Sequence, residues 1–91
     1  MENKAAMKKY RLPERATQED LEMRWNTVLK YGDRILVAGH FWNGPGRPCC
    51  YGAVYEFLGE DQTSEDEIAL RAASEVEFED EGHAIAWGIQ Q

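Results

Sequence analysis

The sequence is poor in cysteine: it contains two, and they are adjacent, Cys49 and Cys50. Neighbouring cysteines provide no disulfide framework of the kind that small secreted domains use. No apolar run approaches the roughly 18 residues of a membrane span, and the longest uninterrupted one extends only from Ile35 to Gly39. The basic N-terminal segment is not followed by an apolar stretch and a small-residue cleavage site. We therefore expect a cytoplasmic protein that does not bind membranes.

Basic residues are also scarce. Ten Lys and Arg stand against seventeen Asp and Glu among 91 residues, which gives a formal net charge of −7. A surface of this sign repels nucleic acid, so we expect no direct nucleic-acid binding and consider a basic protein surface the better partner. With 43% hydrophobic residues the chain can build one modest core, so one domain is expected.

The N-terminal segment, residues 1–16, carries five basic side chains against two acidic ones and is interrupted by Pro13. It is predicted to be a flexible basic arm, which leaves residues 17–91 as the single domain. The pair Thr17 and Asp20 is typical of a helix start, and apolar residues then recur at helical spacing as far as Gly32. The first predicted helix therefore covers residues 17–32.

Two strands are predicted next. Residues 34–42 are rich in β-branched and aromatic side chains and end in a loop that contains glycine and proline. Residues 48–58 fit either a strand, by the alternation of Tyr51, Ala53 and Tyr55, or a helix that begins at Pro48. We prefer the strand, because Gly52 is unfavourable inside a helix and the strand would pair with its predecessor.

A second helix is predicted from a capping box of Ser64 and Glu67, followed by alanines on one side. After it, residues 75–79 alternate strictly between glutamate and apolar residues, and residues 83–89 alternate as well, which predicts a hairpin. Continuation of the helix through Phe78 is an alternative interpretation of residues 74–80. The expected fold is α+β, in the order α-β-β-α-β-β, with an antiparallel sheet and both helices packed on one face.

Acidic residues are concentrated in the second half of the chain. Between Glu56 and Gly82 there are eleven acidic side chains and one basic side chain, Arg71. A row of glutamates on one strand face destabilises a sheet unless a partner compensates the charge. The simpler interpretation is that these acids keep the domain soluble and protect an edge strand. The partner-binding residues that we predict on this surface are Glu65, Asp66, Glu75, Glu77, Glu79, Asp80 and Glu81.

Cys50 and His83 form the basis of an alternative, enzymatic hypothesis. If Pro48 opened a helix, Cys50 would lie near its N-terminus, where the pKa of a thiol is lowered, and His83 would supply a base. The segments "CCYGAVYEFL" and "GHAIAWGI" locally resemble the cysteine-helix and histidine-strand pieces of papain-like and transglutaminase-like cysteine hydrolases. This resemblance implies a nucleophile at Cys50 and a base at His83.

Other motifs are less specific. His40, Cys49, Cys50 and His83 are formally a Cys₂His₂ set, but their spacing departs from that of zinc sites, and no metal or other cofactor is expected. The loop at residues 42–48 lacks the G-K-[ST] ending of a phosphate-binding loop. Its Trp42 and Arg47 are of the types enriched among binding hot spots, so both join the predicted partner-binding residues.

Together these features predict a small acidic interaction module, an inhibitor or adaptor that occupies the basic surface of a nucleic-acid-binding host enzyme or complex. In physical type it resembles the nucleic-acid mimics that phages and mobile elements encode, such as antirestriction and anti-CRISPR proteins. The alternative is the minimal cysteine hydrolase that uses Cys50 and His83. A homodimer formed through exposed aromatic side chains is also considered.

Overall fold

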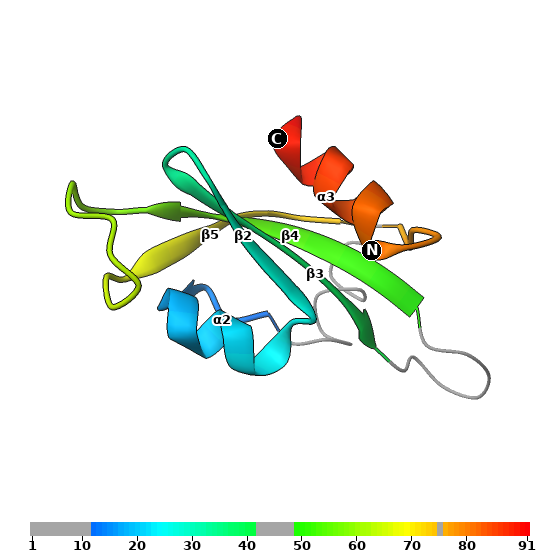
Figure 1. Cartoon of the computed structure of the whole chain (residues 1–91), viewed down its shortest axis with the longest axis horizontal. Helices are drawn as coiled ribbons and strands as arrows, with labels where there is room; N and C mark the ends of the chain where they lie inside the picture. The colour runs from blue at the N-terminus through cyan, green and yellow to red at the C-terminus, as the bar shows by residue number, and fades with distance from the viewer. Residues whose placement is uncertain (1–11, 42–48, 75) are drawn as a thin grey trace.

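A five-stranded antiparallel sheet forms the centre of the computed structural model, which describes residues 12–41, 49–74 and 76–91 (Figure 1). Its strands lie in the spatial order β1-β5-β4-β3-β2. They comprise β1 (Arg15–Ala16), β2 (Thr27–Tyr31), β3 (Arg34–Phe41), β4 (Cys49–Phe57) and β5 (Ile68–Ala73). Two helices, α2 (Gln18–Arg24) and α3 (Glu81–Ile89), complete a single α+β domain. None of the helices within these described ranges has the length and apolar character needed to cross a membrane.

Helix α2 begins where the sequence predicts a helix start. The Thr17 hydroxyl accepts a hydrogen bond from the backbone N–H of Asp20 at 3.2 Å, and the Asp20 carboxylate accepts one from the N–H of Thr17 at 3.0 Å. This reciprocal capping satisfies two otherwise unpaired donors. The helix ends at Arg24, however, and not at Gly32. Residues 27–31 form β2 instead, because β-branched Thr27 and Val28 favour a strand and β3 offers an edge for pairing.

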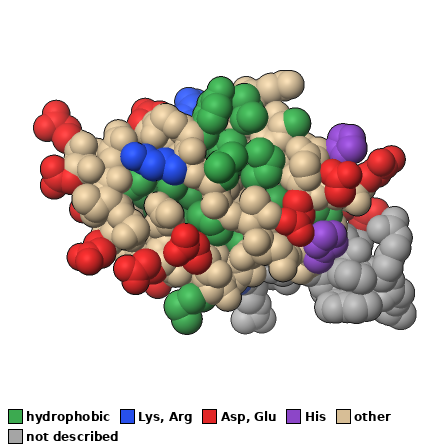
Figure 2. All heavy atoms as spheres, in the orientation of Figure 1, with side chains coloured by type: hydrophobic (Ala, Val, Ile, Leu, Met, Phe, Trp, Pro, Cys, Tyr) green, Lys and Arg blue, Asp and Glu red, His purple; other side chains and the backbone are tan. Residues whose placement is uncertain are grey.

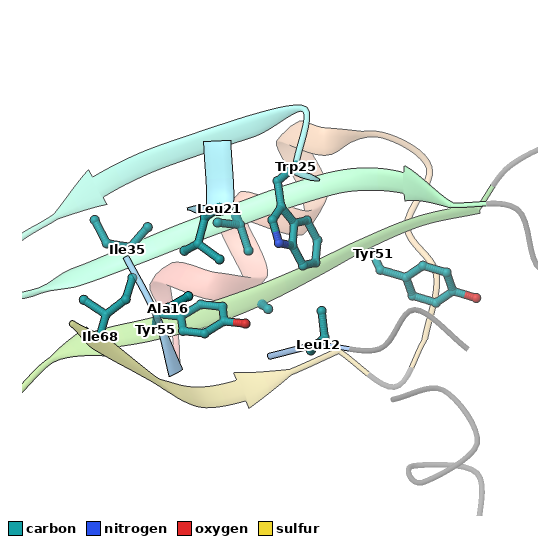
Figure 3. Packing of buried hydrophobic residues seen from close by; sticks show 10 residues of the cluster. Leu12, Ala16, Leu21, Trp25, Ile35, Tyr51, Tyr55 and Ile68 are labelled. Atoms are coloured by element: carbon teal, nitrogen blue, oxygen red, sulfur yellow. The ribbon is translucent and has the colours of Figure 1, made fainter. Parts of the chain in front are cut away.

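The main core lies between α2 and one face of the sheet. Leu21 and Trp25, one helical turn apart, pack there against odd-numbered residues of β3 and β4, as Figure 3 shows. The buried Tyr55 hydroxyl donates a hydrogen bond to the carbonyl of Pro13 at 2.7 Å, and burial raises the pKa of this phenol to about 12. The core residues are Leu12, Ala16, Leu21, Trp25, Ile35, Val37, Tyr51, Ala53, Tyr55 and Ile68.

Helix α3 covers the opposite face of the sheet, so the prediction of two helices on one face is wrong (Figure 1). It packs on even-numbered residues: Ala84 lies against Gly52, and Gly88 lies against Leu36 and Val54. Successive strand residues point to opposite faces, so β3 and β4 supply residues to both cores. The sheet is therefore the middle layer of three.

The second half of the chain departs from the predicted elements. The expected helix from Ser64 is absent: Thr63 and Asp66 form a local turn, and residues 68–73 form β5, which pairs with β4. The expected terminal hairpin is also absent. Phe78 forms a single bridge with Cys50, and residues 81–89 are helical, so neither the strand nor a continued helix is present at residues 76–80. The prediction of a strand at residues 48–58 is confirmed, with the strand extending from Cys49 to Phe57.

The predicted basic arm is only partly within the described residues. Residues 1–11 lie outside them. Leu12 is buried in the main core, and Arg15–Ala16 pairs with β5 as β1. Residues 12–16 therefore belong to the folded domain.

Candidate functional site

The predicted acidic surface is divided between the two ends of the molecule. Glu65 and Asp66 lie in the connection from β4 to β5, whereas Glu79 and Asp80 precede α3 at the far end of β4. At about 3.3 Å per residue, the nine residues of β4 separate these groups by about 26 Å. Figure 2 shows one acidic group at the left end and another beside the histidines at the right. The predicted acidic residues that the structure describes therefore do not lie on one surface (Figure 2).

Several of the predicted acids stabilise the fold itself. Asp80 is the N-cap of α3, and its carboxylate accepts a hydrogen bond from the backbone N–H of His83 at 2.9 Å. Asp66 accepts one from the N–H of Thr63 at 2.8 Å. Capping of this kind explains an acidic residue without any partner protein.

A polar cluster surrounds the beginning of α3. Glu81 accepts a hydrogen bond from the hydroxyl of Thr27 and lies 3.5 Å from Nδ1 of His40. These contacts join α3 to β2 and β3. All three side chains lie on the α3 face of the sheet, at the end where the connection between β3 and β4 begins. The carboxylate of Glu81 therefore has a structural function, which is to fix the start of α3 on the sheet.

Asp80 and His83 form a second pair in this cluster. Their side chains are 2.8 Å apart, Oδ1 to Nδ1, and both are exposed. The hydrogen bond and the charge of Asp80 raise the pKa of His83, and hydrogen bonds from His83 lower the pKa of Asp80. The ring nitrogen of His83 that makes this contact is Nδ1.

Cys50 lies below this cluster but is not arranged as a nucleophile. It is part of strand β4, so the helix start on which the hydrolase hypothesis depends is not present. The thiol is 2% exposed, and its pKa is raised, first by burial and then by the negative charges of Glu81 and Asp80. A thiol with a raised pKa stays protonated at neutral pH, whereas nucleophilic cysteines need a lowered pKa. Cys50 is therefore best described as a packing residue of the α3 face.

Three of the predicted partner-binding residues, Trp42, Arg47 and Glu75, lie outside the described residues. Of the formal metal-ligand set, the side chain of Cys49 lies outside them as well. Within the described ranges, no three His, Cys, Asp or Glu side chains come together in an arrangement that would hold a metal ion.

The other acidic group, which we call the acidic end, consists of exposed carboxylates. The pairing of Ala16 with Ile68 places the first turn of α2 beside the connection from β4 to β5. A salt bridge of 3.2 Å between Arg15 and Glu67 lies at the same junction. The exposed residues that define the acidic end are Glu19, Glu60, Asp61 and Glu65.

The acidic end was only partly predictable. Glu65 was predicted, but Glu60 and Asp61 were not singled out, and Glu19 belongs to an element distant in sequence. The signal that the sequence does contain is the first turn of α2, which carries Glu19 and Asp20. Only the pairing of β1 with β5 brings that turn to the β4–β5 connection.

The described part of the chain is more acidic than the whole. Fifteen of the seventeen acidic side chains lie within it, but only five of the ten basic ones, which leaves it with ten excess negative charges. A surface of this charge attracts basic partners over distances of about one Debye length, close to 8 Å at physiological salt.

Comparison with known proteins identifies the family. No curated protein and no solved structure matches the chain. Residues 12–91 match the family model described as nucleotide modification associated domain 4, and this range includes all the helices and strands of the described residues. The chain therefore belongs to the nucleotide modification associated domain 4 (Nmad4) family and is a small α+β domain from a nucleotide-modification context.

Proposed function

We propose that this domain is an acidic interaction module that binds the basic surface of a nucleic-acid-binding protein in a nucleotide-modification system. The observation that carries the proposal is the acidic end, where Glu60, Asp61 and Glu65 are exposed in the β4–β5 connection and Glu19 is exposed in the adjacent first turn of α2. The membership in the Nmad4 family supports the nucleotide-modification setting. Proteins that act on nucleic acids present basic surfaces, which are the natural counterpart of such carboxylates.

The acidic end is preferred over the beginning of α3 because its carboxylates have fewer structural functions. At the beginning of α3, Asp80 caps the helix and Glu81 holds Thr27 and His40. The exposed acids of the β4–β5 connection bring charge without a comparable contribution to the fold. Like charges placed close together destabilise a domain, and a basic partner would relieve this repulsion.

This role would be that of an inhibitor or adaptor, and the attraction of exposed carboxylates to a basic protein surface is the physical basis of both. An inhibitor would prevent the partner from binding DNA or RNA, whereas an adaptor would leave that binding intact. Competition with a short DNA duplex distinguishes the two outcomes, because only an inhibitor shares its binding surface with the duplex.

The test is a pull-down of nucleic-acid-binding proteins from host lysate with the full chain, at low and at high salt. The decisive variant is Glu60→Lys/Glu65→Lys, and the matched control is Glu77→Lys/Glu79→Lys, which makes the same change of charge at the opposite end. We expect the first variant to lose proteins that the wild type retains at low salt, and the control to keep them.

Two outcomes would contradict the proposal. One is a set of bound proteins that stays the same in the first variant and persists at high salt, since screening weakens contacts between exposed charges. The other is loss of binding in the control alone, which would assign the interface to the beginning of α3. Circular dichroism of each variant checks that the fold is retained.

A further inference from the structure

Helix α3 crosses its face of the sheet diagonally. At its start, Glu81 bonds to Thr27 of β2, and at its end the carbonyl of Gln91 accepts a hydrogen bond from Arg71 of β5 at 3.3 Å. The helix therefore moves away from β2 along its length. The last residues of β2, next to the turn into β3, remain uncovered on this face (Figure 1).

This uncovered corner is apolar. Leu29 and Tyr31 of β2 are 44% and 48% exposed, and Ile89 of α3 is 42% exposed. Leu29 pairs across the sheet with Leu36, which contacts Gly88 and so lies on the α3 face. Figure 2 shows hydrophobic surface in this region of the α3 face. We call Leu29, Tyr31 and Ile89 the apolar corner.

The corner continues into an unpaired strand edge. Strand β2 is the last strand in the order of the sheet, so among the described residues no strand neighbours its outer backbone groups. Natural edge strands are usually protected by charged residues, proline or a bulge. β2 pairs with β3 in unbroken register and contains one charged residue, Lys30. Its ammonium lies 5.7 Å from the centre of the Phe57 ring, over the α2 face, and does not block the edge.

The hairpin turn determines which backbone groups face outward. Tyr31 and Arg34 flank a two-residue turn in which Gly32 has a φ of 63°, as a type II′ turn requires at this position. Residues that flank such a turn form a hydrogen-bonded pair, and the bonding direction alternates along an antiparallel strand. The backbone N–H and C=O groups of Val28 and Lys30 therefore point to the open edge.

We propose that the apolar corner and the edge of β2 form the interface of a homodimer. Two copies of β2 pair antiparallel about a twofold axis at Leu29, which makes one continuous ten-stranded sheet. Leu29 then faces its own copy in a non-hydrogen-bonded pair, where side chains approach most closely. Val28 pairs with Lys30 of the second copy through backbone hydrogen bonds, and Tyr31 lies opposite Thr27 on the α3 face.

The distribution of charge favours a second copy as the occupant. Strand β2 contains no carboxylate, and in this register its single lysine lies opposite Val28 and not opposite another cation. The carboxylate closest to Thr27 is that of Glu81, and it already interacts with the Thr27 hydroxyl and with Nδ1 of His40. Asp33 lies in the turn, beyond the paired segment. The acidic ends of the two copies thus remain outside the interface, and a twofold pair closes on itself without forming fibres.

The expected dimer is weak, because five strand residues and three apolar side chains form less than a standard interface of about 1,600 Å². Its dependence on salt is opposite to that of the proposed partner binding. Each chain carries a net charge of −7, so salt screens the mutual repulsion and strengthens the dimer, whereas it weakens contacts between acidic and basic surfaces. Failure of either proposal can therefore be recognised separately.

The test is sedimentation equilibrium of the full chain over a range of concentrations up to about 1 mM, well above a micromolar dissociation constant. We expect a mass that approaches twice the 10.4 kDa of the chain. Leu29→Lys places two cations face to face on the axis and should weaken association at least about tenfold. The matched control is Met23→Lys, which makes the same change at an 85% exposed position of α2 and should leave the mass unchanged.

Cross-linking tests the register independently. Leu29→Cys should give a disulfide-linked dimer under mild oxidation, whereas Met23→Cys should not exceed the wild-type background. A monomeric mass at every concentration would overturn the proposal. So would a dimer that Leu29→Lys does not weaken, since its interface would have to lie elsewhere.

Discussion

The close contact between α3 and the sheet depends on Gly52, which offers a sharp test of the fold. A Cβ at this position would lie 3.2 Å from Cβ of Ala84, 3.3 Å from the Ala84 carbonyl oxygen and 3.3 Å from the Val37 carbonyl oxygen. None of these atoms is the mobile end of a long side chain. Gly52→Ala must therefore displace backbone of α3 or β3.

Overpacking of this kind destabilises a domain by about 1–3 kcal/mol, and the lower entropy of the unfolded alanine chain offsets about 0.4–1 kcal/mol of it. We expect the free energy of unfolding to fall by about 1–2 kcal/mol. For a domain of this size each kcal/mol corresponds to a decrease in Tm of about 4–8 °C. Urea denaturation followed by circular dichroism measures the change directly.

Two other glycines provide controls for this prediction. At Gly88 a Cβ would meet the terminal methyl groups of Leu36 and Val54 at 3.3 and 3.4 Å, which can move slightly, and alanine gains about 1 kcal/mol of helix propensity. Gly88→Ala should therefore be close to neutral. At Gly59 no atom lies within 4 Å, so Gly59→Ala should be as stable as the wild type. Equal stability of the Gly52 and Gly59 variants would refute the described packing of α3.

Two further predictions concern titratable groups near the start of α3. Because burial and nearby carboxylates raise the pKa of Cys50, its alkylation at neutral pH should be slow in the native protein and fast in urea. Rapid alkylation of the native protein that is abolished in His83→Ala would restore the hydrolase hypothesis. The pKa of His83 is raised above its ordinary 6.5 and that of Asp80 is lowered below 3.8, so their pair stabilises the fold fully between these two values. The difference in Tm between wild type and His83→Ala should be largest near pH 5. It should decrease as the pH rises through the raised pKa of His83, and also as the pH falls through the lowered pKa of Asp80. A difference that is constant from pH 5 to pH 9 would contradict this assignment.

The elements that were predictable from sequence are those with a local chemical cause. Thr17 and Asp20 form the expected cap, and residues 34–41 and 49–57 form the expected strands. The helix after Thr17 was predicted to be too long because Val28 and Leu29 continue the spacing of Leu21. Spacing alone does not show that β3 provides an edge for residues 27–31, and tertiary pairing overrides helical periodicity here.

The segment at residues 64–73 shows the same limitation. Its alanines and its capping pattern favour a helix when they are considered alone. In the structure Ile68 and Leu70 pack into the main core, and residues 68–73 pair with the otherwise open edge of β4. A strand that completes a sheet gains hydrogen bonds and buried surface that a short exposed helix lacks. Local propensity therefore predicted the wrong element.

The candidate site was harder to predict than the fold because it depends on where the ends of strands lie. The acids of the second half are close in sequence, but β5 carries the chain along the length of β4 between Glu65 and Asp80. Carboxylates that are close in sequence therefore lie at opposite ends of the sheet. Glu19, which is distant in sequence, joins Glu65 instead through the pairing of β1 with β5.

The last helix shows why a count of large apolar residues can misassign an element. The alternation of Ile85, Trp87 and Ile89 predicted a strand, but the buried stripe of α3 consists of Ala84 and Gly88, spaced by four. Small residues are buried here because the helix lies directly on Gly52 and Leu36. The large residues then lie on the flanks of the helix, where Ile89 remains 42% exposed. The same close packing leaves Ile89 exposed, and Ile89 is part of the proposed dimer interface.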